Sequence, residues 1–311
     1  MNLMDKNKRY NSLDRYYKEK YGKKVAKISL NANFSCPNKD GTKGYGGCSY
    51  CSKLGSGDFA GNINDDIITQ YQKIKKIMQN KWPDSLFMPY LQANSNTYGN
   101  IEKLKSVYEP LLNEKDIVGI SIATRPDCFT EEIYNYLESI NKKIPIQIEL
   151  GLQTIHDKTA KLINRCSSLE EFENAVKRLR KINIEIVVHI INGLPYETKD
   201  DMLETIKYIN KFDIQGIKFH SLLILKDTKI ALDYEKEQFH ILTLEEYVDI
   251  TVTQIELLRD DIIIHRLAAD CVLEDLITPQ WTRKKLVVMN EIDKLLRKKD
   301  TYQGVHYSGK L

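Results

Sequence analysis

Three cysteines in the first sixth of the chain have the residue type and spacing that suit a metal centre. Cys36, Cys48 and Cys51 follow the pattern C-x11-C-x2-C, with four glycines between the first and the second. Thiolates are soft ligands that favour zinc or iron–sulfur clusters, and glycines allow a loop to wrap around a compact centre. Three thiolates on a four-iron cluster would leave one iron open to a substrate or cofactor.

Two other interpretations of these cysteines are open from spacing alone. A closed zinc site needs four ligands, so zinc would require a distant fourth one such as Cys128 or a histidine. In the second alternative the three thiols are unconnected buried residues. The other cysteines are Cys128, Cys166 and Cys271, and their spacing predicts no role for them.

Length and composition define the class of protein. The chain has 311 residues, of which 42% are hydrophobic and 29% are charged. Such a chain can bury the core of one α/β barrel or two modest domains, and global disorder is excluded. No run of about 18 apolar residues and no secretory signal are present. We therefore expect a cytoplasmic protein with no membrane partner, in a compartment where disulfides are rare.

Apolar runs that alternate with amphipathic stretches predict parallel βαβ units. The expected strands are 24–30, 85–93, 118–123, 145–152, 185–192 and 216–225. The expected helices are 65–79, 131–140, 169–182 and 199–212, with Thr130 and Thr198 as N-caps. Polar or glycine-containing clusters follow the strand ends, which favours a partial (β/α)6 TIM-type barrel.

Three parts of the chain differ in texture. Residues 1–24 form a basic, tyrosine-containing N-terminal segment, and residues 25–235 form the expected barrel. Residues 236–311 form a C-terminal extension that we expect to pack on the barrel. Within it, 244–258 and the basic stretch 283–299 are helix-like, and 262–267 is strand-like.

Six motifs, in order along the chain, resemble those of the radical S-adenosylmethionine enzymes. The resemblance is to a bacterial branch related to the catalytic subunit of Elongator, with a long first cysteine spacing and an aromatic residue, Tyr50, before the last cysteine. The motifs are Asn33–Asn38, Gln92–Tyr98, Ala123–Asp127, Glu149–Thr154, Gly193–Thr198 and His265–Leu267. Together they cover most of the chain.

This resemblance implies the cofactors. Cys36, Cys48 and Cys51 would hold a 4Fe–4S cluster, and the open iron would bind the amino and carboxylate groups of S-adenosylmethionine. One electron from a reductant such as flavodoxin or ferredoxin would then generate a 5′-deoxyadenosyl radical that abstracts a substrate hydrogen. The cofactor carries this chemistry, while the protein orients it and excludes water.

The resemblance also assigns cofactor-binding residues. They are Tyr50, Asn96, Thr97, Arg125, Glu149, Gln153, Arg165 and Pro195. Each has a structural alternative, such as a rim ion pair between Arg125 and Asp127. Related sequences often have glycine after the arginine at position 165, whereas this chain has Cys166. His265 and Arg266 are candidates for substrate contact, whereas His189 and His220 fit satisfied interior histidines better.

The net charge of +3 conceals an uneven distribution. Residues 1–24 carry +5, residues 283–299 carry +5, and the rest of the chain carries −7. Basic residues interleaved with tyrosines suit phosphate contact and base stacking. The resemblance implies a tRNA partner, bound through the basic ends. The reaction would convert the side chain at C5 of the wobble uridine from carboxymethylaminomethyl to aminomethyl.

Two alternative functions compete with this interpretation. One is the same radical chemistry on a small molecule or a protein side chain. The other is a non-enzymatic RNA-binding protein that holds zinc or a cluster.

Overall fold

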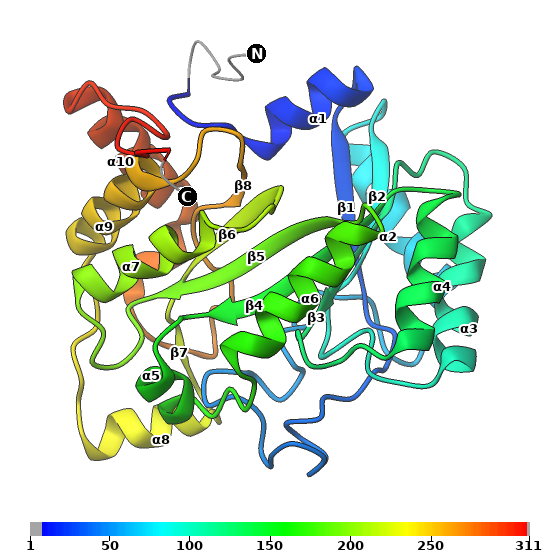
Figure 1. Cartoon of the computed structure of the whole chain (residues 1–311), viewed down its shortest axis with the longest axis horizontal. Coiled ribbons are helices and arrows are strands. Elements are labelled where there is room, and N and C mark those ends of the chain that lie inside the picture. The colour runs from blue at the N-terminus through cyan, green and yellow to red at the C-terminus, as the bar shows by residue number, and fades with distance from the viewer. Residues whose placement is uncertain (1–7, 310–311) are drawn as a thin grey trace.

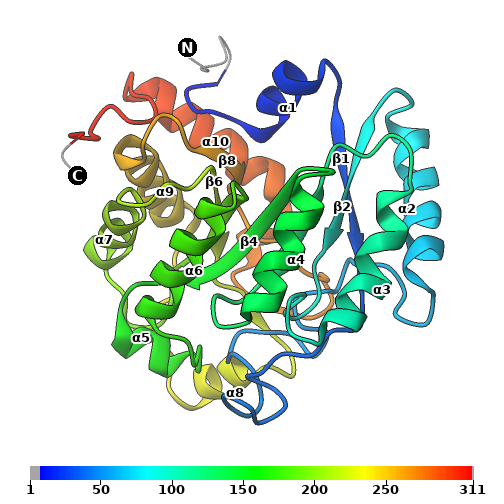
Figure 2. The same ribbon diagram turned by 45° about the vertical axis from the view of Figure 1, so that its right-hand side comes forward.

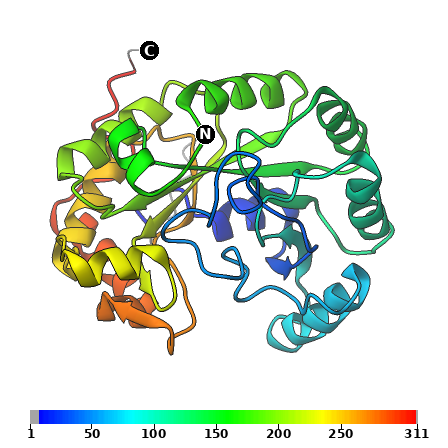
Figure 3. The ribbon, with the colours of Figure 1, turned by 90° about the horizontal axis from the view of Figure 1, so that it is seen from below.

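A curved, seven-stranded parallel sheet forms the centre of the computed structural model, which describes residues 8–309. Its order is β1-β2-β3-β4-β5-β6-β8. The strands are β1 (Val25–Leu30), β2 (Leu86–Leu91), β3 (Ile120–Thr124), β4 (Ile146–Gln153), β5 (Glu185–Asn192), β6 (Gly216–Ser221) and β8 (Ile263–Arg266). The sheet is open between β1 and β8 within the described residues, so the fold is a partial TIM-type barrel, as expected (Figure 3).

The sheet has seven strands rather than the expected six, because β8 comes from the predicted C-terminal extension. Residues Gly216 and Ile263 are register partners, so this extension completes the sheet as well as packing on it. The expected strand 216–225 is divided into β6 and the short β7 (Ile224–Leu225). The latter pairs with β9 (Leu276–Thr278) in a separate two-stranded sheet.

Helices cover the outer side of the curved sheet (Figures 2 and 3). The predicted ones are α2 (Ile67–Lys81), α4 (Glu131–Asn141), α6 (Leu169–Lys181), α7 (Lys199–Ile209), α9 (Leu244–Leu257) and α10 (Lys285–Lys298), which follows the 3-10 helix η1 (Gln280–Lys284). Unpredicted ones are α1 (Leu13–Tyr21), α3 (Ile101–Leu112), α5 (Asp157–Leu162) and α8 (Lys229–Lys236). The hydroxyls of Thr130 and Thr198 accept from backbone N–H groups of α4 and α7, which confirms both predicted N-caps.

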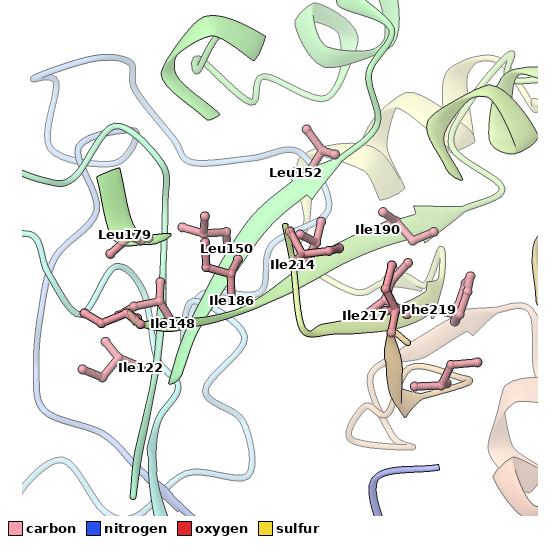
Figure 4. Packing of buried hydrophobic residues seen from close by; sticks show 14 of the residues in the cluster. Ile122, Ile148, Leu150, Leu152, Leu179, Ile186, Ile190, Ile214, Ile217 and Phe219 are labelled. Atoms are coloured by element: carbon pink, nitrogen blue, oxygen red, sulfur yellow. The ribbon is translucent and has the colours of Figure 1, made fainter. Parts of the chain in front are cut away.

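Successive side chains of a strand point to opposite faces, and here the two faces differ in chemistry. The outer face carries buried aliphatic residues such as Leu150, Ile186 and Ile217, which belong to the same hydrophobic cluster as Leu179 of α6 (Figure 4). The inner face instead carries polar and charged residues. They include Lys27, Gln147, Glu149, His189 and Lys218.

The two ends of the barrel have different roles. The segment that follows β1 and contains the three cysteines lies at the end where the strands finish, whereas α1 lies at the end where β1 begins (Figure 1). Lys8 forms an ion pair of 2.8 Å with Asp293 of α10, and Tyr10 and Tyr17 are buried. Two tyrosines of the expected RNA-binding segment are therefore core residues.

Residues 1–7 of that segment, with Lys6, lie outside the described part of the chain. In the part that is described, no helix has the length and apolar character needed to span a membrane.

Candidate active site

A cavity of about 590 Å³ lies at the C-terminal ends of the strands. Its lining includes nine of the residues predicted from the sequence: Cys36, Cys48, Cys51, Tyr50, Arg125, Glu149, Gln153, Arg165 and Arg266. Parallel strands bring their carboxyl ends to one edge, which explains how motifs up to 230 residues apart in the chain meet there. The cavity is large enough for a cofactor-sized ligand.

Backbone and amide hydrogen bonds hold the cysteine segment in place. The side-chain amide of Asn164 donates to the carbonyls of Tyr45 and Gly47, at 3.1 and 2.8 Å. Next to Cys48, the N–H of Ser49 donates to the carbonyl of Ile163 at 2.9 Å. The loop after α5 therefore fixes the position of the segment around Cys48.

The three thiols fit a cluster better than a single zinc ion. All six cysteines lie within the described residues and none forms a disulfide. The Sγ atoms of Cys36, Cys48 and Cys51 do not all lie within 4.8 Å of one another. Ligands at about 2.3 Å from a tetrahedral zinc lie roughly 3.8 Å apart. A larger, cuboidal iron–sulfur cluster suits the all-sulfur donor set.

The protein holds these thiols in a partly buried site. Burial raises the pKa of Cys48 to about 11 and also raises the pKa of Cys51. The positive charge of Arg125 acts in the opposite direction on Cys48. Since the ligand form is the thiolate, cluster binding must release these protons.

Arg125 and Arg165 bind groups of the protein itself, whereas arginines that clamp a cofactor carboxylate would have free N–H donors. Arg125 donates to both carboxylate oxygens of Asp127, at 2.9 and 2.7 Å, and to the carbonyl of Arg165 at 2.7 Å. The guanidinium of Arg165 donates to the carbonyls of Leu152, Thr154 and Ser167. Both arginines thus fix the loops at the ends of β3 and β4, and their contact with a cofactor stays a prediction.

The residue after Arg165 has the backbone shape of a glycine position. Cys166 has φ of +54°, in the left-handed region that glycine adopts most easily. Cys166 therefore adopts the same turn that glycine would form at this position.

Four predicted residues lie outside the cavity lining. Asn96 donates to the carbonyls of Leu91, Ala93 and Ala123 at 3.1, 3.1 and 2.9 Å, and the Thr97 hydroxyl lies 2.6 Å from that of Thr124. Both residues shape the loop after β2. Pro195 is buried in the loop after β5, and His265 packs against Gly216. Their assigned roles stay predictions.

Glu149 is the centre of a buried charge network on the inner face. One of its carboxylate oxygens accepts from Lys27 at 2.5 Å and Ser121 at 2.8 Å, and the other accepts from Lys218 and from His189 at 2.7 Å. The cations hold the pKa of Glu149 well below its usual range, against the opposing effect of burial. The sequence correctly indicated a partner for this carboxylate, but the partners seen here are the protein's own.

Sequence reasoning missed Lys218 as a residue of the site. Burial lowers its pKa to about 7, and the charges of Lys27 and Arg266 act in the same direction. The signal was a lysine and a histidine, Lys218 and His220, two positions apart in an apolar strand. That spacing places both side chains on one face of β6.

Comparison with known proteins identifies the family. A model of the radical SAM superfamily matches residues 44–209, and a model of the radical SAM C-terminal domain matches residues 214–298. The chain is 44% identical to "Uncharacterized protein YtqA" of Bacillus subtilis (strain 168), over 96% of this chain and 92% of that one. It is 31% identical to "Protein YhcC" of Escherichia coli (strain K12), over 89% of both chains.

A solved structure of similar fold is that of Methanocaldococcus infernus Elp3 lacking residues 1–46, with a TM-score of 0.68 at 17% identity. The match covers 90% of this chain and 64% of Elp3, so this chain spans less than two thirds of that protein. The family models and the curated relatives agree. The chain belongs to the radical S-adenosylmethionine superfamily, whose members bind a 4Fe–4S cluster and S-adenosylmethionine.

Proposed function

We propose that this radical S-adenosylmethionine enzyme modifies tRNA at the wobble uridine, converting the C5 side chain from carboxymethylaminomethyl to aminomethyl. The observation that carries the proposal is the set of six Elongator-like motifs, most of which reach one cavity together with the three thiols. The fold likeness to Elp3 supports it at the level of architecture.

The residues around the cavity have different roles in this proposal. Cys36, Cys48 and Cys51 would hold the cluster, and Tyr50 and Gln153 line the space beside them. When bound, the cluster and S-adenosylmethionine supply a radical that abstracts hydrogen from the substrate. The protein positions the reacting carbon and keeps water away from it. A one-electron reductant, such as flavodoxin or ferredoxin, completes the system.

The mouth of the cavity offers a surface suited to RNA. Tyr45 and Phe59 in the segment after β1 are 80% and 55% exposed, and Phe59 also lines the cavity. Lys39 and Lys53 belong to the same segment, and the Nζ of Lys39 donates to the carbonyl of Lys53 at 3.2 Å. Exposed rings can stack on bases while ammonium groups contact phosphates. We therefore place the RNA at this mouth rather than on α1.

The basic C-terminal stretch reaches the same mouth at its beginning. Lys285 pairs with Asp270, which lines the cavity, and Arg283 donates to the carbonyl of Leu273. Farther along the chain, Asp293 of α10 and Asp300, which follows that helix, pair with the N-terminal Lys8 and Arg9. Of the two expected RNA-binding ends, we therefore propose that the region around 283–285 contacts the RNA.

Nucleoside analysis of tRNA from a strain lacking this gene tests the substrate. We expect carboxymethylaminomethyl-uridines to accumulate at the wobble position and aminomethyl derivatives to disappear, with recovery on expression of the wild-type gene. Unchanged wobble uridines would contradict the tRNA assignment and leave a small molecule or protein as substrate. Anaerobic purification tests the remaining alternative, a non-enzymatic RNA-binding protein. A colourless protein that holds only zinc would not be a radical enzyme.

A further inference from the structure

Two cations from neighbouring strands lie on the wall of the cavity. Lys218 of β6 and Arg266 of β8 are register partners, and both residues line the cavity. The side chain of Lys218 is 6% exposed and that of Arg266 is 29% exposed. Arg266 is near enough for its charge to influence Lys218, His189 and His220.

The carboxylates on this wall do not balance its cations. Both oxygens of Glu149 already accept two hydrogen bonds each, and one acceptor site is taken by Lys218. Asp270 lies 3.6 Å from Arg266 but is also paired with Lys285. The contact of 3.6 Å between Arg266 and Asp270 is longer than a hydrogen bond. An excess of positive charge therefore faces the cavity.

Two unsatisfied polar atoms belong to the same wall. The Nε2 of His220 and the Oγ of Ser221 are buried and have no hydrogen-bond partner in the described part of the chain. Both residues line the cavity. Buried polar groups in native proteins are nearly always paired, so orphaned groups beside two cations indicate a missing polar ligand.

We infer that Lys218 and Arg266 bind a carboxylate of the substrate, with His220 and Ser221 as further polar contacts. The planar fork of arginine matches the two oxygens of a carboxylate, and lysine supplies a second charge. This inference rests on the proposed function, because the carboxymethyl group is the part of that substrate which the product lacks. Anchoring it here holds the adjacent methylene in the cavity that the three cysteines line.

Binding without turnover tests the inference. The holoenzyme, loaded with cluster and S-adenosylmethionine but given no reductant, is titrated with two synthetic anticodon stem-loops. One carries carboxymethylaminomethyl-uridine and the other its uncharged carboxamide. We expect the wild type to bind the carboxylate form about 10- to 100-fold more tightly, as one charge-assisted pair allows. Arg266→Gln should reduce this preference several-fold, to what Lys218 alone provides, and leave the affinity for the carboxamide unchanged.

Matched variants separate a specific site from general charge. Lys211→Met removes a positive charge from an exposed position after α7 and should keep the full preference. Arg266→Lys retains the charge and should keep part of it. A wild-type protein that binds both stem-loops equally overturns the inference. So does an Arg266→Gln variant that binds both forms more weakly to the same degree, because its ligand would then be an RNA phosphate.

Failure of the tRNA assignment has a different signature. If the wild type does not bind either stem-loop, the proposed function fails. N-methylglycine then serves as the probe for the carboxylate site. It carries the same methylene and carboxylate on a secondary amine. Its binding to the wild type but not to Arg266→Gln would retain the carboxylate site. No binding to the wild type would overturn the site as well.

Discussion

The side-chain amide of Asn164 donates a 2.8 Å hydrogen bond to the carbonyl of Gly47, the residue before Cys48. Asn164 has φ of +52°, a conformation that asparagine and aspartate adopt more readily than most residues. The turn after α5 therefore holds the cysteine segment through a donor that aspartate lacks.

Asn164→Asp should loosen the cluster while leaving the fold intact. The variant keeps the tolerance for the left-handed backbone but places a charged acceptor against two carbonyls. We expect the visible absorbance of the cluster to decay several-fold faster in the presence of an iron chelator. Asn183→Asp, at another left-handed position with φ of +57°, is the control and should decay at the wild-type rate. Equal decay of all three proteins would exclude this role for Asn164.

Replacement of Cys36, Cys48 or Cys51 by alanine should abolish the cluster. Each removes one of three thiolates, and a cuboidal cluster with two protein ligands is not retained. Iron and sulfide analysis after anaerobic reconstitution should give about four of each for the wild type and near none for the variants. Cys166→Ala removes an exposed thiol and should retain full loading. A Cys48→Ala variant with a full cluster would disprove the ligand assignment.

Glu149→Gln should destabilise the protein strongly. It leaves the buried Lys218 and the half-buried Lys27 without their shared counter-charge, at a cost of about 3–5 kcal/mol. In a chain of this size the midpoint of thermal unfolding should fall by roughly 5–10 °C at neutral pH. Glu235→Gln, at an exposed position of α8, should shift it by little. Equal midpoints for the two variants would show that the network does not contribute to stability.

The pH dependence of this network has a definite sign. The pKa of Glu149 is lowered in the folded protein, so its contribution to stability is full at pH values above the pKa of an unfolded glutamate. That contribution is lost only as the pH falls through the lowered value. The difference in midpoint between the wild type and Glu149→Gln should therefore not fall between neutral and weakly acidic pH.

Lys218 should make carboxylate binding depend on pH. Its pKa is lowered to about 7, so the ammonium form that attracts the carboxylate is lost as the pH rises through 7. Among its neighbours, Glu149 stays ionised, and Tyr90, His189, His220 and His265 stay neutral across this range, while Lys27 and Arg266 add positive charge. The preference for the carboxylate over the carboxamide stem-loop should fall several-fold between about pH 6.5 and pH 8.5.

Lys218→Met tests the origin of that pH profile. The variant should show a smaller preference that no longer changes between these pH values, because Arg266 alone remains. A preference that falls with pH equally in the variant would assign the titration to another group.

The mouth of the cavity should account for the salt dependence of RNA binding. Lys53→Gln should reduce the slope of log affinity against log salt concentration by about one, which corresponds to the loss of one phosphate contact. Phe59→Ala should weaken binding by about 1–3 kcal/mol without changing that slope, because a stacking contact is lost. Lys18→Gln, on α1 at the opposite end, should behave like the wild type. A larger effect of Lys18 than of Lys53 would place the RNA on the N-terminal segment.

Much of the barrel could be predicted from the sequence because its signals are local. The strand 185–192 and the N-caps Thr130 and Thr198 depend on residues that are adjacent in the chain. The seventh strand was assigned to an extension because four residues, Ile263–Arg266, carry too little pattern to show which sheet they join.

The charge network could not be predicted in the same way. Lys27 and Lys218 lie 122 and 69 residues from Glu149 in the chain, and only the curvature of the sheet brings them together. The sequence therefore showed that a buried carboxylate needs a partner but not which one. Likewise, Arg165 looked like a clamp for a ligand carboxylate, and the loop carbonyls that its guanidinium binds are visible only in three dimensions.

The most direct test of the account is a reaction of the anaerobic holoenzyme with S-adenosylmethionine, a one-electron reductant and tRNA from the deletion strain, followed by nucleoside analysis. We predict that aminomethyl-uridine forms at the wobble position together with 5′-deoxyadenosine, and that Cys48→Ala forms neither. Release of 5′-deoxyadenosine while the carboxymethylaminomethyl-uridine of the tRNA stays unchanged would contradict the account.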